Sequence, residues 1–169
     1  MFSRTIKTPA GNVCIACSET AVKGLWFEGQ KYFGGIHRDE LYKCDKHILL
    51  DETELWLREY FDGKKPSPFE LPLSPQGSEF RQEVWSLLCE IPYGELVTYG
   101  EIARRSGRRN MSAQAVGCAV GHNPISIIIP CHRVIAANRS LCGYAGGIHI
   151  KQQLLKHEGH DLSAFSVPK

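Results

Sequence analysis

The chain has 169 residues, of which 43% are hydrophobic and 22% charged, and its formal net charge is +2. These values describe an ordinary globular protein of one domain or two small ones. No apolar run is long enough for a membrane-spanning helix, and the amino terminus lacks the pattern of a signal peptide, so we expect no membrane partner and a location in the cytoplasm of a prokaryote or the nucleus of a eukaryote.

The first 30 residues alternate apolar and polar side chains around two glycines, which predicts a hairpin or meander of strands. Cys14 and Cys17 form a CxxC pair within this stretch. Residues three apart on a strand point to opposite faces, so a shared zinc ion would need a bulge or turn there, and we expect no metal. The odd number of cysteines, seven, favours reduced thiols over a disulfide framework.

A helix is predicted from Asp51 to Asp62, with Asp51 as its N-cap and Gly63 ending it. Four prolines between residues 64 and 77 exclude a regular helix and predict a linker. We therefore expect a domain boundary near residue 77, with residues 1–77 forming an amino-terminal domain and residues 78–169 a carboxy-terminal one.

The carboxy-terminal half is predicted to be mainly helical. Apolar spacing and capping residues predict helices over 79–89, 99–105, 112–121 and 151–157. Thr98 and Glu101 form a capping box at the start of the second of these, and Gly159 ends the last. Two short helices joined by a glycine-containing turn suit a helix-turn-helix.

Basic residues gather in this half as well, because residues 1–77 carry a net charge of −1 and residues 78–169 one of +3. Four arginines lie within six residues, at positions 104, 105, 108 and 109. They are suited to phosphate contacts, although a solvated charged turn has the same composition.

Cys131 is the leading candidate for a nucleophile. It follows the apolar run 127–129 and Pro130, and His132 and Arg133 come directly after it. The thiolate is the reactive form of cysteine, and a neighbouring base or cation raises its fraction. The alternative is a buried and inert cysteine packed beside a histidine.

The surroundings of Cys131 resemble the active-site signature of the O6-alkylguanine-DNA alkyltransferases. The resemblance is strong over residues 78–160 and weaker before them. The motifs that carry it are Phe80, Val84-Trp85, Ile91-Pro92-Tyr93-Gly94, Thr98-Tyr99-Gly100-Glu101-Ile102-Ala103, Ala115-Val116-Gly117, Asn123-Pro124, Pro130 to Val134, Gly143 to Gly147, and Leu154 to Gly159. It implies an amino-terminal α/β domain of ribonuclease H-like type and a mainly α carboxy-terminal domain with a winged helix-turn-helix.

The resemblance also implies a reaction, direct-reversal DNA repair without a cofactor. Cys131 would take the alkyl group from O6-alkylguanine, and from O4-alkylthymine, and would be consumed because nothing releases the thioether. His132 would accept the thiol proton through a water and Glu158 would orient the imidazole, so we expect a lowered thiol pKa.

Further residues are assigned by the same resemblance. Tyr99 would assist protonation of the leaving guanine. The residues expected to hold the extruded base or to support the site are Asn123, Val134, Tyr144, Ala145 and Lys151.

Double-stranded DNA is the implied partner, bound by a monomer through its minor groove. The expected DNA contacts are Arg108, Arg109, Ala113, Gln114 and Arg133. Gln114 is a departure, since the family almost always has an arginine there that enters the base stack. The spacing between Tyr99 and Gln114 is also one residue longer, so the turn at 108–111 is expected to differ.

Two other functions remain open at this point. A lesion-binding module would flag alkylated DNA without transferring the group, but such relatives lack the active cysteine. A cysteine hydrolase would need an oxyanion hole and turnover.

Overall fold

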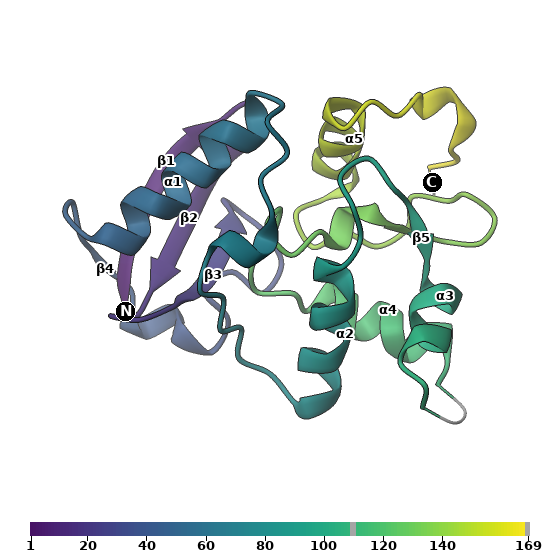
Figure 1. Ribbon diagram of the computed structural model, residues 1–169, viewed down its shortest axis with the longest axis horizontal. Coiled ribbons are helices and arrows are strands. Elements are labelled where there is room, and N and C mark those ends of the chain that lie inside the picture. The colour runs from purple at the N-terminus through teal and green to yellow at the C-terminus, as the bar shows by residue number, and fades with distance from the viewer. Residues whose placement is uncertain (109–110, 168–169) are drawn as a thin grey trace.

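The amino-terminal half is a four-stranded sheet covered by one helix. A computed structural model describes residues 1–108 and 111–167. In the sheet order β3-β2-β1-β4, the first three strands pair antiparallel and β4 pairs parallel to β1. The bounds are Phe2–Thr8 for β1, Gly11–Cys17 for β2, Val22–Phe27 for β3 and Tyr42–Lys43 for β4. Helix α1, Ile48–Phe61, lies along the sheet (Figure 1).

The predicted strands are confirmed, and β2 is buried from Val13 to Cys17. The pairing of β2 with β3 shifts register between Ala16 and Cys17, so the irregularity that a CxxC metal site would need does occur. Even so, no group of three or more potential metal-ligating side chains is assembled within residues 1–108 and 111–167.

Helix α1 begins three residues earlier than predicted. His47 is the N-cap, because its Nδ1 accepts a hydrogen bond from the backbone NH of Leu49 at 3.3 Å. Asp51, the predicted cap, lies inside the helix and forms an ion pair with Arg4 at 2.7 Å. Histidine is not among the usual capping residues, which is why the sequence pattern did not reveal this start.

The carboxy-terminal half is mostly helical, as predicted. Helices α2 and α3 have the predicted bounds, with Thr98 and Glu101 forming the expected capping box. Helix α4 follows its cap Ser112 directly. Helix α5 begins three residues before the predicted Lys151, immediately after Gly147 in a left-handed conformation. The bounds are Glu79–Cys89 for α2, Val97–Thr98 for β5, Tyr99–Arg105 for α3, Ala113–Gly121 for α4, Val134–Ile135 for β6 and Ile148–His157 for α5. Short 3₁₀ helices lie at Gly35–Glu40, Pro68–Glu70, Cys131–Arg133 and Leu162–Ala164.

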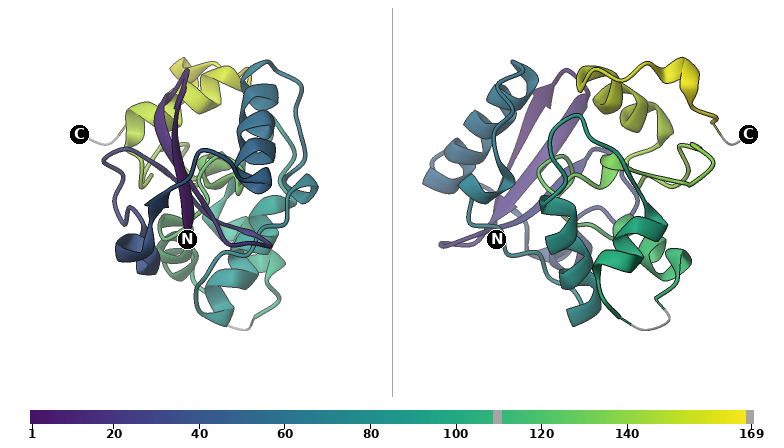
Figure 2. Two further views of the ribbon diagram at one scale, coloured as in Figure 1. Left: turned by 90° about the vertical axis from the view of Figure 1, so that its left-hand side faces the viewer. Right: turned by 45° about the vertical axis from the view of Figure 1, so that its right-hand side comes forward.

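The two halves are joined along strand β3. On this strand the NH of Val22 donates to the carbonyl of Pro72 in the predicted linker, and the NH of Leu25 donates to the carbonyl of Pro124, both at 2.9 Å. One apolar cluster runs through both halves and includes Leu57 and Val84. The linker therefore covers a sheet edge that would otherwise expose unpaired backbone groups. The two halves lie side by side in Figure 1 and in the right-hand view of Figure 2.

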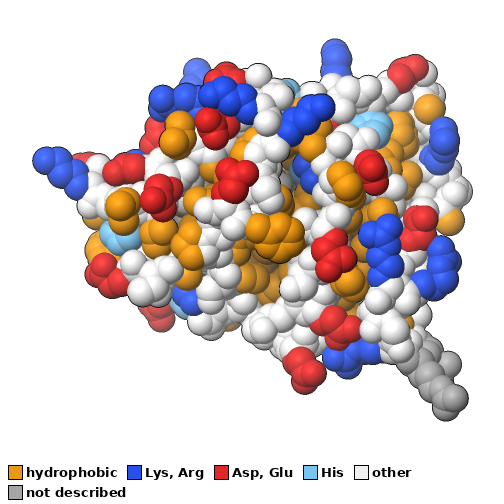
Figure 3. All heavy atoms as spheres, viewed as in Figure 1, with side chains coloured by type: hydrophobic (Ala, Val, Ile, Leu, Met, Phe, Trp, Pro, Cys, Tyr) orange, Lys and Arg blue, Asp and Glu red, His pale blue; other side chains and the backbone are white. Residues whose placement is uncertain are grey.

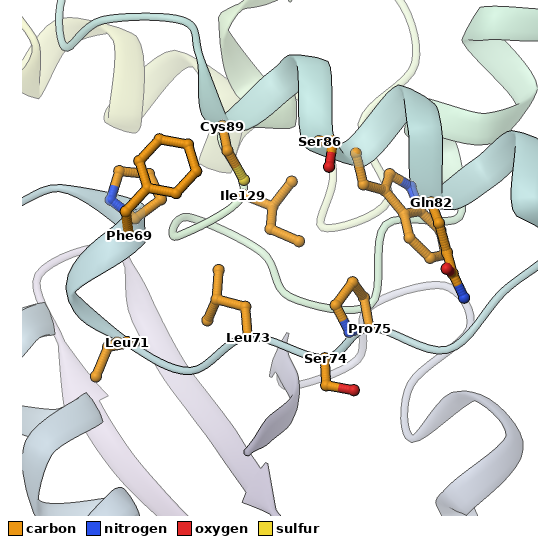
Figure 4. A pocket seen from close by; sticks show the side chains of 11 residues that line it. Phe69, Leu71, Leu73, Ser74, Pro75, Gln82, Ser86, Cys89 and Ile129 are labelled. Atoms are coloured by element: carbon orange, nitrogen blue, oxygen red, sulfur yellow. The ribbon is translucent and has the colours of Figure 1, made fainter.

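A cavity of about 410 Å³ lies between the linker and α2. Figure 4 shows Leu73 and Pro75 on its linker side and Cys89 and Ile129 opposite them. Phe69, at one end of it, is 71% exposed. Hydrophobic side chains are visible in the middle of this face of the molecule (Figure 3). Within the described part of the chain, no helix is long and apolar enough to cross a bilayer.

Candidate active site

Cys131 is the first residue of the 3₁₀ helix Cys131–Arg133, which follows a turn segment held by the side chain of Asn123. The carboxamide Nδ2 of Asn123 donates to the Ile129 carbonyl at 2.9 Å and to the sulfur of Cys131 at 3.0 Å, while its Oδ1 accepts from the NH of Ile125 at 3.0 Å. Ile127 has a φ of 69°, a conformation that is unfavourable for a β-branched residue and persists only where the surroundings enforce it. The turn thus fixes the position of the sulfur.

The resting thiol is neutral. Burial raises the pKa of Cys131, and neither the hydrogen bond from Asn123 nor the charge of Lys151 offsets this effect. The expectation of a lowered thiol pKa is therefore wrong for this structure, because the cysteine is only 5% exposed and a charged form would lose its hydration. A base has to remove the proton when the site is used.

His132 is the residue that was predicted to be that base. Its Nε2 lies 2.7 Å from Oε1 of Glu158, and both side chains are fully buried. Burial is the main cause of a lowered pKa for His132, so the imidazole is neutral. Because Nε2 must carry the proton to donate to the carboxylate, Nδ1 bears the lone pair, and it has no hydrogen-bond partner among the described residues.

Glu158, the C-cap residue of α5, is ionised. Its Oε1 accepts from Tyr60 Oη at 2.8 Å and Arg133 Nη2 at 3.0 Å as well as from His132. Its Oε2 accepts from Arg133 Nε at 2.9 Å and from the NH of Gly94 at 3.1 Å. Burial would raise the pKa of this carboxyl, but the hydrogen bond from His132 and the hydrogen bonds and charge of Arg133 outweigh it and hold the pKa well below its usual range.

The position of Arg133 disagrees with its predicted role in DNA binding. The residue is 5% exposed, its guanidinium is paired with Glu158, and its Nη1 donates to the Ile91 carbonyl at 2.6 Å. A guanidinium enclosed in this way cannot reach a phosphate. Arg133 therefore compensates the buried carboxylate.

Lys151 is also fully buried, on α5. Its Nζ donates to the Val134 carbonyl at 2.6 Å and to the Cys142 carbonyl at 3.4 Å. Burial lowers the pKa of Lys151 to about 8, although charge on Cys131 would raise it. The lysine thus orders the backbone on one side of the cysteine, and it occupies the Val134 carbonyl that was predicted to accept from guanine.

An open cavity of about 600 Å³ lies beside Cys142, whose carbonyl accepts from Lys151. Tyr99, Gln114, Tyr144 and Ala145 line it, and Tyr99 donates to the Cys142 carbonyl at 3.1 Å. Burial is the main cause of a raised pKa for both tyrosines.

Gly146 belongs to the loop that carries Tyr144 and Ala145. A Cβ at this position would come within 2.9 Å of the Tyr144 ring and 3.1 Å of Phe27, so no larger residue fits without displacing one of them. The close approach of this loop to the sheet half therefore depends on glycine.

The sheet half contributes two residues to the cavity that the sequence did not reveal, Lys31 and Tyr32. The NH of Lys31 donates to the Ala145 carbonyl at 3.0 Å, and the ring of Tyr32 stacks on His122 at 4.3 Å. Tyr32 has a φ of 62°, which is uncommon outside glycine. The positive φ of Tyr32 marks it as unusual, but a backbone angle can be known only from a structure. The sequence therefore contained no signal that could have identified this residue.

Helices α3 and α4 pack against each other, and Ala113 and Gln114 are exposed at the start of α4. Arg108 is exposed but is paired with Glu83 on α2 at 2.6 Å. Arg109, and with it part of the turn at 108–111, lies outside the described residues. Lys and Arg side chains are visible around α3 on the face shown in Figure 3.

Comparison with known proteins gives a consistent result. The family model described as 6-O-methylguanine DNA methyltransferase, ribonuclease-like domain, matches residues 1–75, and the model for the DNA binding domain of the same family matches residues 79–160. Among curated proteins, the methylated-DNA--protein-cysteine methyltransferase of Shigella flexneri is 49% identical over 169 residues, covering 96% of this chain and 98% of its own. The protein of that name from Methanosarcina mazei is 43% identical over 162 residues, covering 96% and 99%.

The structure of Mycobacterium tuberculosis OGT in complex with DNA superposes with a TM-score of 0.83 at 38% identity, covering 98% of this chain and 95% of the other. The matched structure therefore has the same α/β half followed by the same helical half. With both family models and full-length relatives in agreement, the chain belongs to the 6-O-methylguanine DNA methyltransferase family.

Proposed function

We propose that this protein repairs alkylated DNA directly, by moving the alkyl group of O6-alkylguanine to Cys131. The observation that carries the proposal is the buried group in which Asn123 fixes the sulfur and Glu158 holds His132 with a free lone pair. The names of the full-length relatives support the same activity.

The partner is double-stranded DNA, as supported by the relative solved in complex with DNA. Exposed Ala113 and Gln114 begin α4 beside the cavity, in the position of a helix that enters a groove. We propose the minor groove, whose degenerate pattern suits a protein that must act in any sequence. A monomer suffices, because a single chain contains every residue of the site.

An alkylated base stacked in a duplex is inaccessible to a buried thiol, so the nucleotide is extruded into the cavity of about 600 Å³. Tyr144 forms one wall of this space, and the backbone NH of Ala145 donates to the guanine oxygen. Gln114 fills the vacated position in the base stack. As a neutral amide it does so without the charge of an arginine.

The chemical step is an in-line displacement. Nδ1 of His132 takes the thiol proton through a water, and Glu158 stabilises the imidazolium that results. The sulfur forms a bond to the alkyl carbon as the bond from that carbon to O6 breaks. The electron pair stays on guanine, which takes up a proton with the help of Tyr99. In sum, the thiol proton passes to guanine and the alkyl group passes to sulfur.

The reaction consumes the protein. A thioether is chemically stable, so the alkyl group stays on the sulfur. Each molecule therefore acts once, on either an O6-alkylguanine or an O4-alkylthymine.

Intact mass measurement tests the proposal. After incubation under reducing conditions with duplex DNA containing O6-methylguanine, the protein should gain one methyl group, and Cys131→Ala should gain none. Binding to the lesion without a mass change would support a lesion-binding module instead. Turnover without modification would support a hydrolase.

A further inference from the structure

Tyr60 connects the sheet half of the molecule to the catalytic carboxylate. It lies near the end of α1 and is 1% exposed, and its hydroxyl donates to Glu158 Oε1 at 2.8 Å. Its carbonyl accepts from His157 Nε2, also at 2.8 Å. The ring stacks on Trp56, with centroids 5.7 Å apart and an interplanar angle of 7°. Two polar contacts and a stacked ring hold the hydroxyl in one place.

The oxygen that Tyr60 contacts is the one that holds His132. Oε1 of Glu158 accepts from Tyr60 Oη at 2.8 Å, from His132 Nε2 at 2.7 Å and from Arg133 Nη2 at 3.0 Å. Each further donor offsets part of the negative charge on that oxygen. The hydroxyl of Tyr60 therefore leaves less charge available to stabilise a protonated His132.

We propose that Tyr60 is a positioning residue for the His132–Glu158 pair, through which the amino-terminal half keeps His132 neutral and ready to accept the thiol proton. The inference rests on the proposed function, since it assigns Tyr60 a part in the alkyl transfer by Cys131. It gives the sheet half a role in the chemistry in addition to its role in packing.

Other charged or titratable groups surround the pair. Arg133 and Cys131 lie on the same 3₁₀ turn, Lys151 and His157 come from α5, and Tyr93 comes from the loop before β5. Arg133 and Lys151 both lower the pKa of His132. Of these groups, Tyr93 offers a matched control. It packs edge-on against Tyr60 at 5.8 Å, but its hydroxyl donates to the His157 carbonyl at 3.1 Å and not to the carboxylate.

The experiment compares wild type, Tyr60→Phe and Tyr93→Phe, each of which keeps its ring. The rate at which iodoacetamide labels Cys131 is followed by peptide mass mapping between pH 4.5 and 9. Protonation of His132 removes the base and sets the acid limb of this profile. In Tyr60→Phe the carboxylate should stabilise the imidazolium more strongly, so the acid limb should move to higher pH by roughly half a unit to one unit. Tyr93→Phe should keep the wild-type profile.

An unchanged profile in Tyr60→Phe, a shift to lower pH, or an equal shift in both variants would overturn the proposal. Thermal unfolding of the three proteins tests whether each is folded. If Tyr60→Phe loses stability but keeps the wild-type pH profile, Tyr60 has a purely structural role and the proposal is also overturned. Because iodoacetamide reports on the thiol without DNA, the result is independent of the methyl-transfer assay. Wild type can therefore pass that assay while this inference fails.

Discussion

Replacing Arg133 by methionine tests whether this residue stabilises the fold or binds DNA. Methionine keeps much of the side-chain length but removes the guanidinium, which has Nε and Nη2 within 3.0 Å of Glu158 and Nη1 within 2.6 Å of the Ile91 carbonyl. The carboxylate would stay buried and would lose the arginine that is paired with it, while the Ile91 carbonyl would lose its donor.

The size of the effect follows from burial. Breaking a buried ion pair by removing one partner costs about 3–5 kcal/mol, because an uncompensated charge remains inside the protein. For a chain of this length, 1 kcal/mol lowers the melting temperature by about 2–4 °C, so Arg133→Met should melt about 6–20 °C below wild type. Arg108→Met is the control, since its ion pair with Glu83 is at the surface, with the arginine side chain 43% exposed, and such pairs contribute about 0–1 kcal/mol.

Thermal unfolding by circular dichroism and urea titration provide the stabilities. DNA affinity at several salt concentrations provides the number of phosphate contacts, because each contact adds to the slope of log affinity against log salt. We expect Arg133→Met to lose stability and, at a temperature where it is folded, to keep the wild-type salt slope. A stable variant with a smaller slope would show that Arg133 reaches the DNA and that this reasoning is wrong.

Two further results are expected. Gln114→Arg should raise the repair rate on duplex DNA and leave the rate on free O6-benzylguanine nearly unchanged, as measured by the mass gain over time, because only the duplex requires extrusion; equal effects on both substrates would refute that role. Because the pKa of Lys151 is lowered from 10.5 to about 8, the folded protein binds fewer protons than the unfolded chain between these values, so the lysine should add about 3 kcal/mol of stability as the pH rises through that window. Urea titrations of wild type and Lys151→Met at pH 8 and 10.5 should show that wild type gains this stability relative to the variant, and a constant difference between the two would contradict it.

Local signals in the sequence were sufficient to predict most of the helices in the carboxy-terminal half. Helices α2 and α3 have the predicted bounds, because apolar side chains at helical spacing mark the first and the capping box of Thr98 and Glu101 marks the start of the second. The starts of α1 and α5 were wrong, since one is capped by a histidine and the other follows a glycine without any side-chain cap. Both of these starts depend on contacts that are not among the common capping patterns.

The site was predictable only where its residues are near Cys131 in the chain or belong to the family signature. Arg133 was predicted to contact DNA, and the carboxylate that makes its burial possible is 25 residues away in the chain. Tyr60 lies 98 residues before Glu158, and Lys31 and Tyr32 reach the cavity only because the halves pack along β3. Contacts of this kind depend on tertiary packing, and the spacing of apolar and polar residues along the sequence does not predict them.

The contribution of Lys31 and Tyr32 to the cavity has an evolutionary consequence. The reacting sulfur, its base and its carboxylate all come from residues after 130, whereas this part of the rim comes from a loop near residue 30. Under the proposed function, mutations in that loop should change which adducts are admitted without altering any group that takes part in bond making. Lineages exposed to different alkylating agents therefore have a region in which to diversify while the reaction itself is preserved.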